Sequence, residues 1–429
     1  MRATIVRGVA YFSYTPLLGL AAAVTFGKLI AYAGLVDVGQ FGSLGKMLLV
    51  SAVFGLGGNL GLQSVASRDL PALLARGRAR RGLRLLAQTV AVTTAIGLLC
   101  ALAALAGLSL FELSAQELVL GLVHGWSQSI FLTATYESRS RLEMMRYARD
   151  TAVRSLVVAL AGAAAGAAGA GASGILLAEA ACTLGLFSAV AAAASRRART
   201  SIAWLLAASG SGLRSLPWRA APVLLAGAVV VFASTNLDRW IAAEWLGREP
   251  FGQYAFAWLT LLAAQSAQAL LNSGLLPLLA RRRAEALEAS AYRLTRLVSL
   301  ALLAGGLALT GPLAWLIGMA IDRFMPQYGG AVALLAPMLL AAVLRLSDFW
   351  TSLLIVVERE GLVLVSQLAA AVIAIAGYLA WLVAAGVAPA PLSLAWLAFA
   401  AALLSHAAGA AGVYACWWRA RRQAGGIKS

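Results

Sequence analysis

Charge is scarce in this chain. Only 12% of its residues are Asp, Glu, Lys or Arg, whereas soluble domains carry about 25%. Apolar residues make up 61%, and runs of about 20 of them, long enough to cross a bilayer as a helix, recur along nearly the whole length. The alternating strands of roughly ten residues that build a membrane barrel are missing. The composition therefore predicts an all-α polytopic membrane protein.

Catalytic and metal-binding patterns are missing as well. Cys100, Cys182 and Cys416 lie in or at the edge of apolar runs, which favours neither a disulfide framework nor a metal site. No phosphate-binding loop and no HExxH, GxSxG or CxxC pattern occurs. We expect no enzyme activity, no cofactor and no metal. A transporter driven by a gradient, or by its substrate's own disequilibrium, fits this pattern better.

The net charge of +17 could suggest nucleic acid as a partner, but the placement of the basic residues argues against it. All but six of the 34 lysines and arginines lie near the chain ends or in every second connection between apolar runs, such as the five from Arg139 to Arg154. This pattern orients membrane helices and places both termini in the cytoplasm. The six exceptions are Lys28, Lys46, Arg239, Arg248, Arg323 and Arg345.

Twelve transmembrane spans in two sets of six are predicted. Because six is even, both halves enter the membrane from the same side, so they form a parallel repeat about a pseudo-two-fold axis along the membrane normal. We expect an N-terminal lobe over 1–200, a cytoplasmic inter-lobe linker over 201–219, a C-terminal lobe over 220–416 and a basic cytoplasmic tail over 417–429. The spans are 9–33, 40–65, 85–110, 117–136, 151–170, 174–194, 220–245, 252–277, 295–318, 331–357, 362–386 and 392–416.

A repeat within the sequence supports these two halves. The stretch Gly34–Arg68, shifted by 213 positions, falls on Gly247–Arg281, and six residues of scarce types coincide without a gap. Such residues are rare enough in apolar helices to indicate a duplicated unit. We expect each copy to start with an outer hairpin turn, where glycine permits a tight reversal. The coinciding pairs are Gly34 and Gly247, Gly39 and Gly252, Gln40 and Gln253, Asn59 and Asn272, Gly61 and Gly274, and Arg68 and Arg281.

Four cations lie inside predicted spans. An ionisable side chain at the centre of a membrane helix costs about 2.5 to 3.5 kcal/mol on insertion scales, so each one suggests a cavity or a pathway. Lys28, Lys46 and Arg239 lie toward the outer ends of their spans. They either extend to the outer interface or form the cationic outer half of a central cavity. Arg345 lies near the middle of its span, three residues before Asp348, with which we expect it to pair.

Histidines and acids inside spans are candidates for coupling transport to protons, because His titrates near neutral pH. His124 shares a helical face with Gln128, and His406 lies near the centre of the last span. Each histidine is either a hydrogen-bonded packing residue or part of a proton relay. The coupling candidates are His124, Glu179, Asp238, Asp348 and His406.

Amide side chains form a stripe in the eighth span. Gln265, Gln268 and Asn272 are spaced at i, i+3 and i+7, which places them on one helical face. They either bind neighbouring helices or line a water-filled cavity. Asn59 is a further amide inside a predicted span.

The segment 160–174 is almost entirely Ala and Gly. Gly162 and Gly166 are four residues apart, a spacing that lets two helices approach closely. We expect this segment to serve helix packing.

The chain resembles the oligosaccharide and polysaccharide flippases, of the O-antigen type, in the multidrug/oligosaccharidyl-lipid/polysaccharide exporter superfamily. The resemblance covers essentially the full length. It rests on Gly34-Leu-Val-Asp-Val-Gly39-Gln-Phe41, the Arg-rich link after Arg68, Asn236-Leu-Asp238-Arg239, Leu246 to Tyr254, and Pro277 before Arg281.

This resemblance implies two six-helix lobes around a central cavity that opens alternately to either side of the bacterial inner membrane. It implies a polyisoprenyl-diphosphate-linked oligosaccharide as substrate, moved from the cytoplasmic to the outer leaflet for surface polysaccharide assembly. Cations at depth suit the diphosphate, so Lys28, Lys46, Arg239 and Arg345 are the substrate-binding candidates. For the sugar hydroxyls the resemblance implies polar amides, and the candidates are Asn59, Gln265, Gln268 and Asn272. Expected partners are membrane lipids and the polysaccharide polymerase and chain-length machinery, with no nucleic acid.

Other branches and classes fit less well. Lipid II flippases resemble the chain but usually have fourteen spans and an acid-base pair after the Tyr-Ala of the eighth, where this chain has Phe256-Ala257. Cation-coupled multidrug exporters tend to carry acidic residues in the first helix, and here that helix has none. A membrane glycosyltransferase or polymerase would need a sizeable outer loop, and the outer connections are short.

Overall fold

The computed structural model describes the backbone of residues 2–210, 212–213, 216–285 and 288–425. Within these ranges, the side chains of residues 2–13, 202, 231, 234, 273, 274, 276, 277, 280, 284, 288 and 419–425 are not described. The predicted basic tail from Arg419 onward, the terminal Arg2 and Arg7, and Pro277 therefore lie outside the described side chains.

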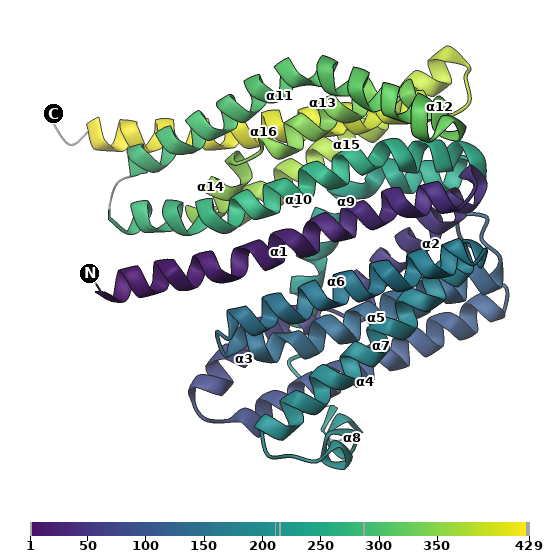
Figure 1. Cartoon of the computed structure of the whole chain (residues 1–429). Coiled ribbons are helices and arrows are strands. Elements are labelled where there is room, and N and C mark those ends of the chain that lie inside the picture. The colour runs from purple at the N-terminus through teal and green to yellow at the C-terminus, as the bar shows by residue number, and fades with distance from the viewer. Residues whose placement is uncertain (1, 211, 214–215, 286–287, 426–429) are drawn as a thin grey trace. The chain divides into compact units, whose positions relative to one another are not determined.

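The described chain is helical almost throughout and contains no strand, so the all-α prediction is confirmed (Figure 1). Each predicted span lies in one helix or in a run of short helices. Ten helices of the described chain are long and apolar enough to cross a membrane, or up to eleven when a pair bent by 73° within one helix counts as a single span. The protein is a multi-pass membrane protein.

Two compact units divide between Val229 and Val230. The first contains α1 (Arg2–Leu35), α2 (Val38–Gly57), α3 (Leu62–Ala75), α4 (Ala79–Leu105), α5 (Ala115–Ser140), α6 (Met144–Ala167), α7 (Gly171–Arg197) and α8 (Ile202–Gly210). The division falls inside α9 (Ala221–Trp245). The second contains α10 (Arg248–Ala284), α11 (Glu288–Phe324), the short η2 (Pro326–Tyr328) and α12 (Gly329–Val332), α13 (Leu335–Leu346), α14 (Trp350–Val356), α15 (Glu360–Ala385) and α16 (Pro391–Gly425).

The two units repeat one packing pattern. In unit 1, α5 packs against α2, α4 and α7, and α6 packs against α7. In unit 2, α13 packs in the same way against α10, α11 and α16, and α15 packs against α16. The sequence repeat therefore corresponds to a repeat of helix packing.

The helix α5 lies at the centre of unit 1, although it is not among the apolar candidate spans. Its Glu, His, Gln, Ser and Thr residues lower its hydropathy. A capping box between Ser114 and Glu117 fixes its first turn. Polar residues inside a membrane helix usually face the protein interior, so α5 is the element most able to carry a buried site.

The two predicted hairpin turns are present, between α1 and α2 and between α9 and α10. Their expected cause is wrong, because Gly34 lies inside α1 and Gly247 has a φ of −59°. Neither glycine uses the left-handed backbone that only glycine adopts easily. Instead, the Asp37 side chain caps α2 by accepting from the Gln40 amide at 2.8 Å.

The predicted close approach at Gly162 is confirmed. The α6 helix packs along α1 there, and a Cβ atom on Gly162 would lie 2.0 Å from the Tyr32 hydroxyl oxygen. At Gly166 the nearest atom, on Leu35, would be 3.2 Å away. Because Gly162 has no side chain, the Tyr32 ring can occupy the space beside it.

Gly162→Ala is expected to lower the free energy of unfolding by about 1 to 3 kcal/mol, because the methyl group overpacks the α1–α6 contact. Gly185→Ala in α7 is the matched control, since a Cβ there meets no atom within 4 Å. Thermal unfolding of the purified variants in detergent measures both. Equal melting temperatures for Gly162→Ala and the control would contradict the close contact.

Candidate functional site

A buried polar cluster joins three helices of unit 1 at Glu179. Its carboxylate on α7 accepts from the Lys28 amine of α1 at 2.6 and 2.7 Å and from the Tyr32 hydroxyl at 2.7 Å. The His124 ring of α5 lies 2.9 Å from the same carboxylate through Nε2. Glu179 is 1% exposed, Lys28 10% and His124 0%. We call this set, with Arg154, the Glu179 cluster.

The His124 ring extends the cluster to a fourth helix. Its Nδ1 lies 2.9 Å from the Ser51 hydroxyl of α2, and the Gln128 amide nitrogen is 3.0 Å from Nε2. Since a carboxylate only accepts, a neutral His124 that bonds to Glu179 carries its proton on Nε2, and Ser51 then donates to Nδ1. The ring orientation is thus fixed from both sides.

Arg154 adds a second cation to the cluster. The charge count groups it with the arginines from Arg139 to Arg154, and in the structure it lies within α6, as Arg146 and Arg149 do. Its guanidinium stacks over the Phe131 ring at 5.3 Å and interacts electrostatically with Glu179. Among the described residues its Nε has no hydrogen-bond partner. Among the described residues Lys28 is the cation paired directly with Glu179, whereas Arg154 acts on it only through longer-range electrostatics. The cluster thus holds two cations and one carboxylate, an excess of positive charge.

Lys46 belongs to a different pair. It is fully buried in α2, and its amine lies 3.5 Å from the carboxylate of Glu112, which is 66% exposed in the connection before α5. Lys28 and Lys46 therefore have different acidic partners, Glu179 and Glu112.

Unit 2 contains a smaller cluster around Asp238 on α9. The Tyr254 hydroxyl of α10 donates to it at 2.7 Å, and the Arg345 guanidinium of α13 lies 3.7 Å away. Arg345 also donates to the Thr235 carbonyl at 2.5 Å. The Arg239 guanidinium lies over the Trp258 ring at 4.6 Å. Each unit thus holds a buried carboxylate between a tyrosine hydroxyl and a cation.

The expected pair of Arg345 with Asp348 is wrong. The helix α13 ends at Leu346, so Asp348 is not one turn further along the same helical face. Its carboxylate instead accepts from the Thr351 hydroxyl at 2.9 Å and from the Thr351 amide at 3.4 Å, next to the start of α14. Asp348 therefore stabilises a helix break.

Two amides of the α10 stripe bond to residues near this helix break. Gln268 donates to the Asp348 carbonyl at 3.0 Å, and Asn272 accepts from Ser352 at 2.8 Å. These two amides therefore hold helices together. Gln265 differs, because its buried amide nitrogen has no hydrogen-bond partner in the described part of the chain.

Asn59 bonds to nearby backbone groups, so its contacts differ from those of Asn272. It lies where α2 gives way to α3, and its amide bonds to the Gly55 carbonyl and the Gly61 amide, each at 3.0 Å. At the matching position α10 is continuous. The local structures differ because Gly61 has a φ of +81°, with Leu60 also left-handed, and these residues end the first helix.

His406 is held through both ring nitrogens. Trp350 donates to its Nε2 at 3.3 Å, and its Nδ1 lies 3.2 Å from the Leu344 carbonyl. The neutral ring satisfies both contacts, which favours packing over a proton relay.

His406→Gln is expected to lower the free energy of unfolding by about 1 to 3 kcal/mol, through the partners it leaves unsatisfied, while transport per folded molecule stays unchanged. The measurement pairs thermal unfolding with a transport assay normalised to inserted protein. Lost transport at wild-type stability would instead make His406 part of the coupling path.

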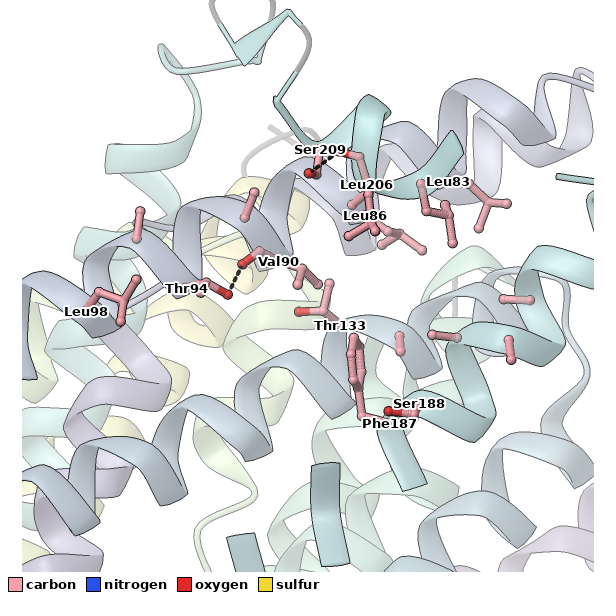
Figure 2. Close-up of a pocket in the computed structure, with 18 residues that line it drawn as sticks. Leu83, Leu86, Val90, Thr94, Leu98, Thr133, Phe187, Ser188, Leu206 and Ser209 are labelled. Carbon is pink, nitrogen blue, oxygen red and sulfur yellow. Dashed lines mark hydrogen bonds between the residues drawn. The ribbon is translucent and has the colours of Figure 1, made fainter. Parts of the chain in front are cut away.

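An apolar cavity of about 640 Å³ lies in unit 1 between α4, α5, α7 and α8 (Figure 2). Its wall includes Leu83, Leu86, Val90, Leu98, Phe187 and Leu206. The polar groups among its lining residues already donate to the backbone, as Thr94 does to Val90 at 2.8 Å and Ser209 to Leu206 at 2.7 Å. The cavity therefore suits hydrocarbon rather than sugar.

Sequence reasoning found Lys28, His124 and Glu179 but not their contacts. It missed Tyr32, Ser51 and Arg154 in unit 1, and Tyr254 and Thr235 in unit 2. An uncharged Tyr or Ser in an apolar run does not stand out as a candidate site residue. Arg154 could have been found, because it is a cation inside the predicted span 151–170. The three cysteines are free, and no group of three or more His, Cys, Asp or Glu in the described chain could hold a metal ion.

Comparison with known proteins identifies the fold. No family model and no curated protein matches the chain. Its structure is similar to the lipid II flippase MurJ in an inward closed conformation, with a TM-score of 0.67, 11% identity, and coverage of 94% of this chain and 87% of MurJ. It is also similar to a MATE transporter of Vibrio cholerae, with a TM-score of 0.55, 15% identity and 98% coverage of both chains.

A third structure, an inward-facing multidrug resistance MATE family transporter of the MOP superfamily, matches with a TM-score of 0.54, 12% identity, and coverage of 96% of this chain and 95% of that one. At these identities the likeness shows the fold. The chain has the two-lobed helical fold that MurJ and the MATE transporters of the MOP superfamily share.

Proposed function

We propose that this protein is a flippase that moves a polyisoprenyl-diphosphate-linked oligosaccharide from the cytoplasmic to the outer leaflet of the bacterial inner membrane for surface polysaccharide biosynthesis. The observation that carries the proposal is the excess of positive charge in the Glu179 cluster, where Lys28 is paired with Glu179 and Arg154 adds a second buried cation. A diphosphate makes strong charge-assisted hydrogen bonds to such cations. The fold likeness to MurJ, a lipid II flippase, supports a lipid-linked substrate.

The apolar cavity gives the second support. A polyisoprenyl chain is pure hydrocarbon. The side-chain hydroxyls that line the cavity each donate to a backbone carbonyl, namely those of Thr94, Thr133, Ser188 and Ser209. Unit 1 therefore offers separate surroundings for the charged and the apolar parts of one amphiphile. Gln265, whose amide nitrogen has no hydrogen-bond partner among the described residues, is the amide we assign to the sugar part.

Binding and coupling act on the same carboxylate in this proposal. An incoming diphosphate competes with Glu179 for Lys28 and Arg154, and a proton delivered to Glu179 through His124 weakens the Lys28 pair further. Alternating access then follows from making and breaking the contacts between α1, α5 and α7. Transport that is unaffected when the proton gradient is collapsed would exclude this coupling.

A lipid II flippase is the second candidate, favoured by the likeness to MurJ. A cation-coupled multidrug exporter is less compatible with the described chain, because α1 carries Lys28 and no acidic residue, and a buried positive charge repels cationic drugs. The polysaccharide polymerase and chain-length machinery are the proposed partners at the outer leaflet.

Deletion of the gene tests the proposal in its own host. We expect the undecaprenyl-linked oligosaccharide to accumulate on the cytoplasmic leaflet and surface polysaccharide to disappear, with both restored by the wild-type gene. Normal surface polysaccharide in a clean deletion would refute the proposal. A block in peptidoglycan precursor export would support the lipid II reading, and altered drug susceptibility alone would support the exporter.

A further inference from the structure

A second cavity in unit 1, of about 830 Å³, is rich in arginine. It lies where α3 meets α4, beside α8, and is distinct from the apolar cavity. Its charged and amide lining consists of Arg76, Arg80, Arg81, Arg84, Asp69 and Gln88. We call it the arginine pocket.

The charge of the arginine pocket is unbalanced. Arg76, Arg80, Arg81 and Arg84 are all exposed, and in the described part of the chain no ion pair joins any of them to an acid. The single acid in the lining, Asp69, is already paired with Arg68 at 2.7 Å. The pocket therefore presents four guanidinium groups to an anion.

The other wall of the pocket is apolar. Trp204 of α8 is half-buried there, together with Leu73, Leu85, Leu216 and Pro217. Leu85 and Leu216 belong to a buried core with Leu62, and Leu73 and Trp204 pack against that core. Close to the pocket, α8 exposes Leu206 to 70% and the chain after it exposes Trp218 to 37%. An anion that also carries a hydrocarbon chain fits this combination better than a free anion does.

The position agrees with a membrane surface. The pocket lies at the first turns of α4, a candidate span, in the connection that the arginine distribution places in the cytoplasm. Basic pockets at this level of a membrane protein are suited to acidic lipid headgroups, and tryptophan favours the same depth.

We propose that the arginine pocket binds the headgroup phosphate of an anionic phospholipid of the cytoplasmic leaflet, and that this lipid holds α8 against α4. Since α8 lies in the predicted linker over 201–219, the bound lipid orders the segment between the lobes. The site is separate from the Glu179 cluster, and the proposal holds whichever substrate the protein moves.

Native mass spectrometry of the purified full chain tests the site. With phosphatidylglycerol and phosphatidylcholine supplied in equal amounts, we expect the protein to retain phosphatidylglycerol preferentially. The double variant Arg80→Gln, Arg84→Gln should weaken that retention about thirtyfold, given roughly 1 kcal/mol per basic residue near an acidic lipid. The matched control Arg146→Gln, Arg149→Gln removes two arginines from the first turns of α6 and should retain phosphatidylglycerol as the wild type does.

Hydrogen exchange of the segment 202–210 supplies an independent readout. Phosphatidylglycerol should slow exchange there in the wild type and in the control, but not in the Arg80, Arg84 double variant. All variants must keep the wild-type melting temperature for the comparison to count, and Trp204→Ser replaces the double variant if that one is unstable.

Four outcomes would overturn the proposal. Equal retention of the two lipids, or equal loss in the control variant, would mean that no specific headgroup site exists. Displacement of phosphatidylglycerol by millimolar inorganic phosphate would indicate a site for a free anion. Displacement of the bound phosphatidylglycerol by equimolar polyisoprenyl diphosphate, but not by added phosphatidylglycerol, would assign the pocket to the substrate.

Discussion

Glu179→Gln is expected to abolish transport and to destabilise the protein by about 3 to 5 kcal/mol, the usual cost of breaking a buried ion pair. The substitution keeps the shape of the side chain but leaves Lys28, which is 10% exposed, without its carboxylate. Transport measured per inserted molecule, and thermal unfolding in detergent, give the two readouts.

A double variant separates the two effects of this change. Lys28→Met combined with Glu179→Gln removes both charges, so it should regain most of the lost stability while transport stays absent. The control Glu285→Gln breaks an exposed pair with Arg281, and it should change neither readout appreciably, since exposed pairs contribute about 0 to 1 kcal/mol. Full transport in Glu179→Gln would remove the Glu179 cluster from the mechanism.

Arg345→Gln is expected to have a comparable effect in unit 2. The change removes both the pairing with Asp238 at 3.7 Å and the donation to the Thr235 carbonyl at 2.5 Å, and it leaves the buried Asp238 carboxylate, to which Tyr254 donates, without this cation. We expect transport to fall at least tenfold and stability to fall by about 3 kcal/mol, as for one partner of a buried pair.

Two further variants are compared with Arg345→Gln. Arg345→Lys is the conservative change, and Arg281→Gln is the exposed control. Lysine keeps the charge but not the planar fork that reaches two acceptors, so partial transport is expected. Arg281 is 71% exposed, and its loss should be silent. Wild-type transport by an Arg345→Gln protein that inserts normally would contradict a role for the Asp238 cluster.

Helix placement could be predicted from the sequence because it depends on local properties. Apolar runs define the spans, and scarce residues such as Gln40 and Gln253 mark the repeat that the packing of the two units confirms. The close approach at Gly162 could also be predicted from the sequence, because a small residue leaves space for whichever helix packs against it.

Contacts between distant residues could not be predicted in the same way. Lys28 and Glu179 are 151 positions apart, and no local pattern indicates which acid pairs with which cation. The break after Leu346 has neither Gly nor Pro to announce it, so the pairing of Arg345 with Asp348 was a reasonable but wrong inference. Arg154 shows the same limit, because the sequence places it in the predicted span 151–170 but does not indicate that Phe131 and Glu179 are its neighbours.

The two units are alike in packing but differ in their charged residues. Unit 1 has two cations around Glu179, whereas Asp238 in unit 2 is paired with Arg345 while Arg239 stacks on Trp258. Duplicated positions such as Asn59 and Asn272 have also acquired different contacts. We infer that the anionic part of the substrate is bound mainly by unit 1.

The most direct test is transport of the proposed substrate by the purified protein in liposomes. A polyisoprenyl-diphosphate oligosaccharide with a labelled sugar is supplied in the leaflet that corresponds to the cytoplasm, and an impermeant glycosidase reports its arrival in the other leaflet. We predict transfer by the wild type and by Arg281→Gln, and none by the stabilised Lys28→Met, Glu179→Gln double variant. Transfer by that double variant at the wild-type rate, or no transfer by a wild-type protein that moves cationic drugs, would contradict the account.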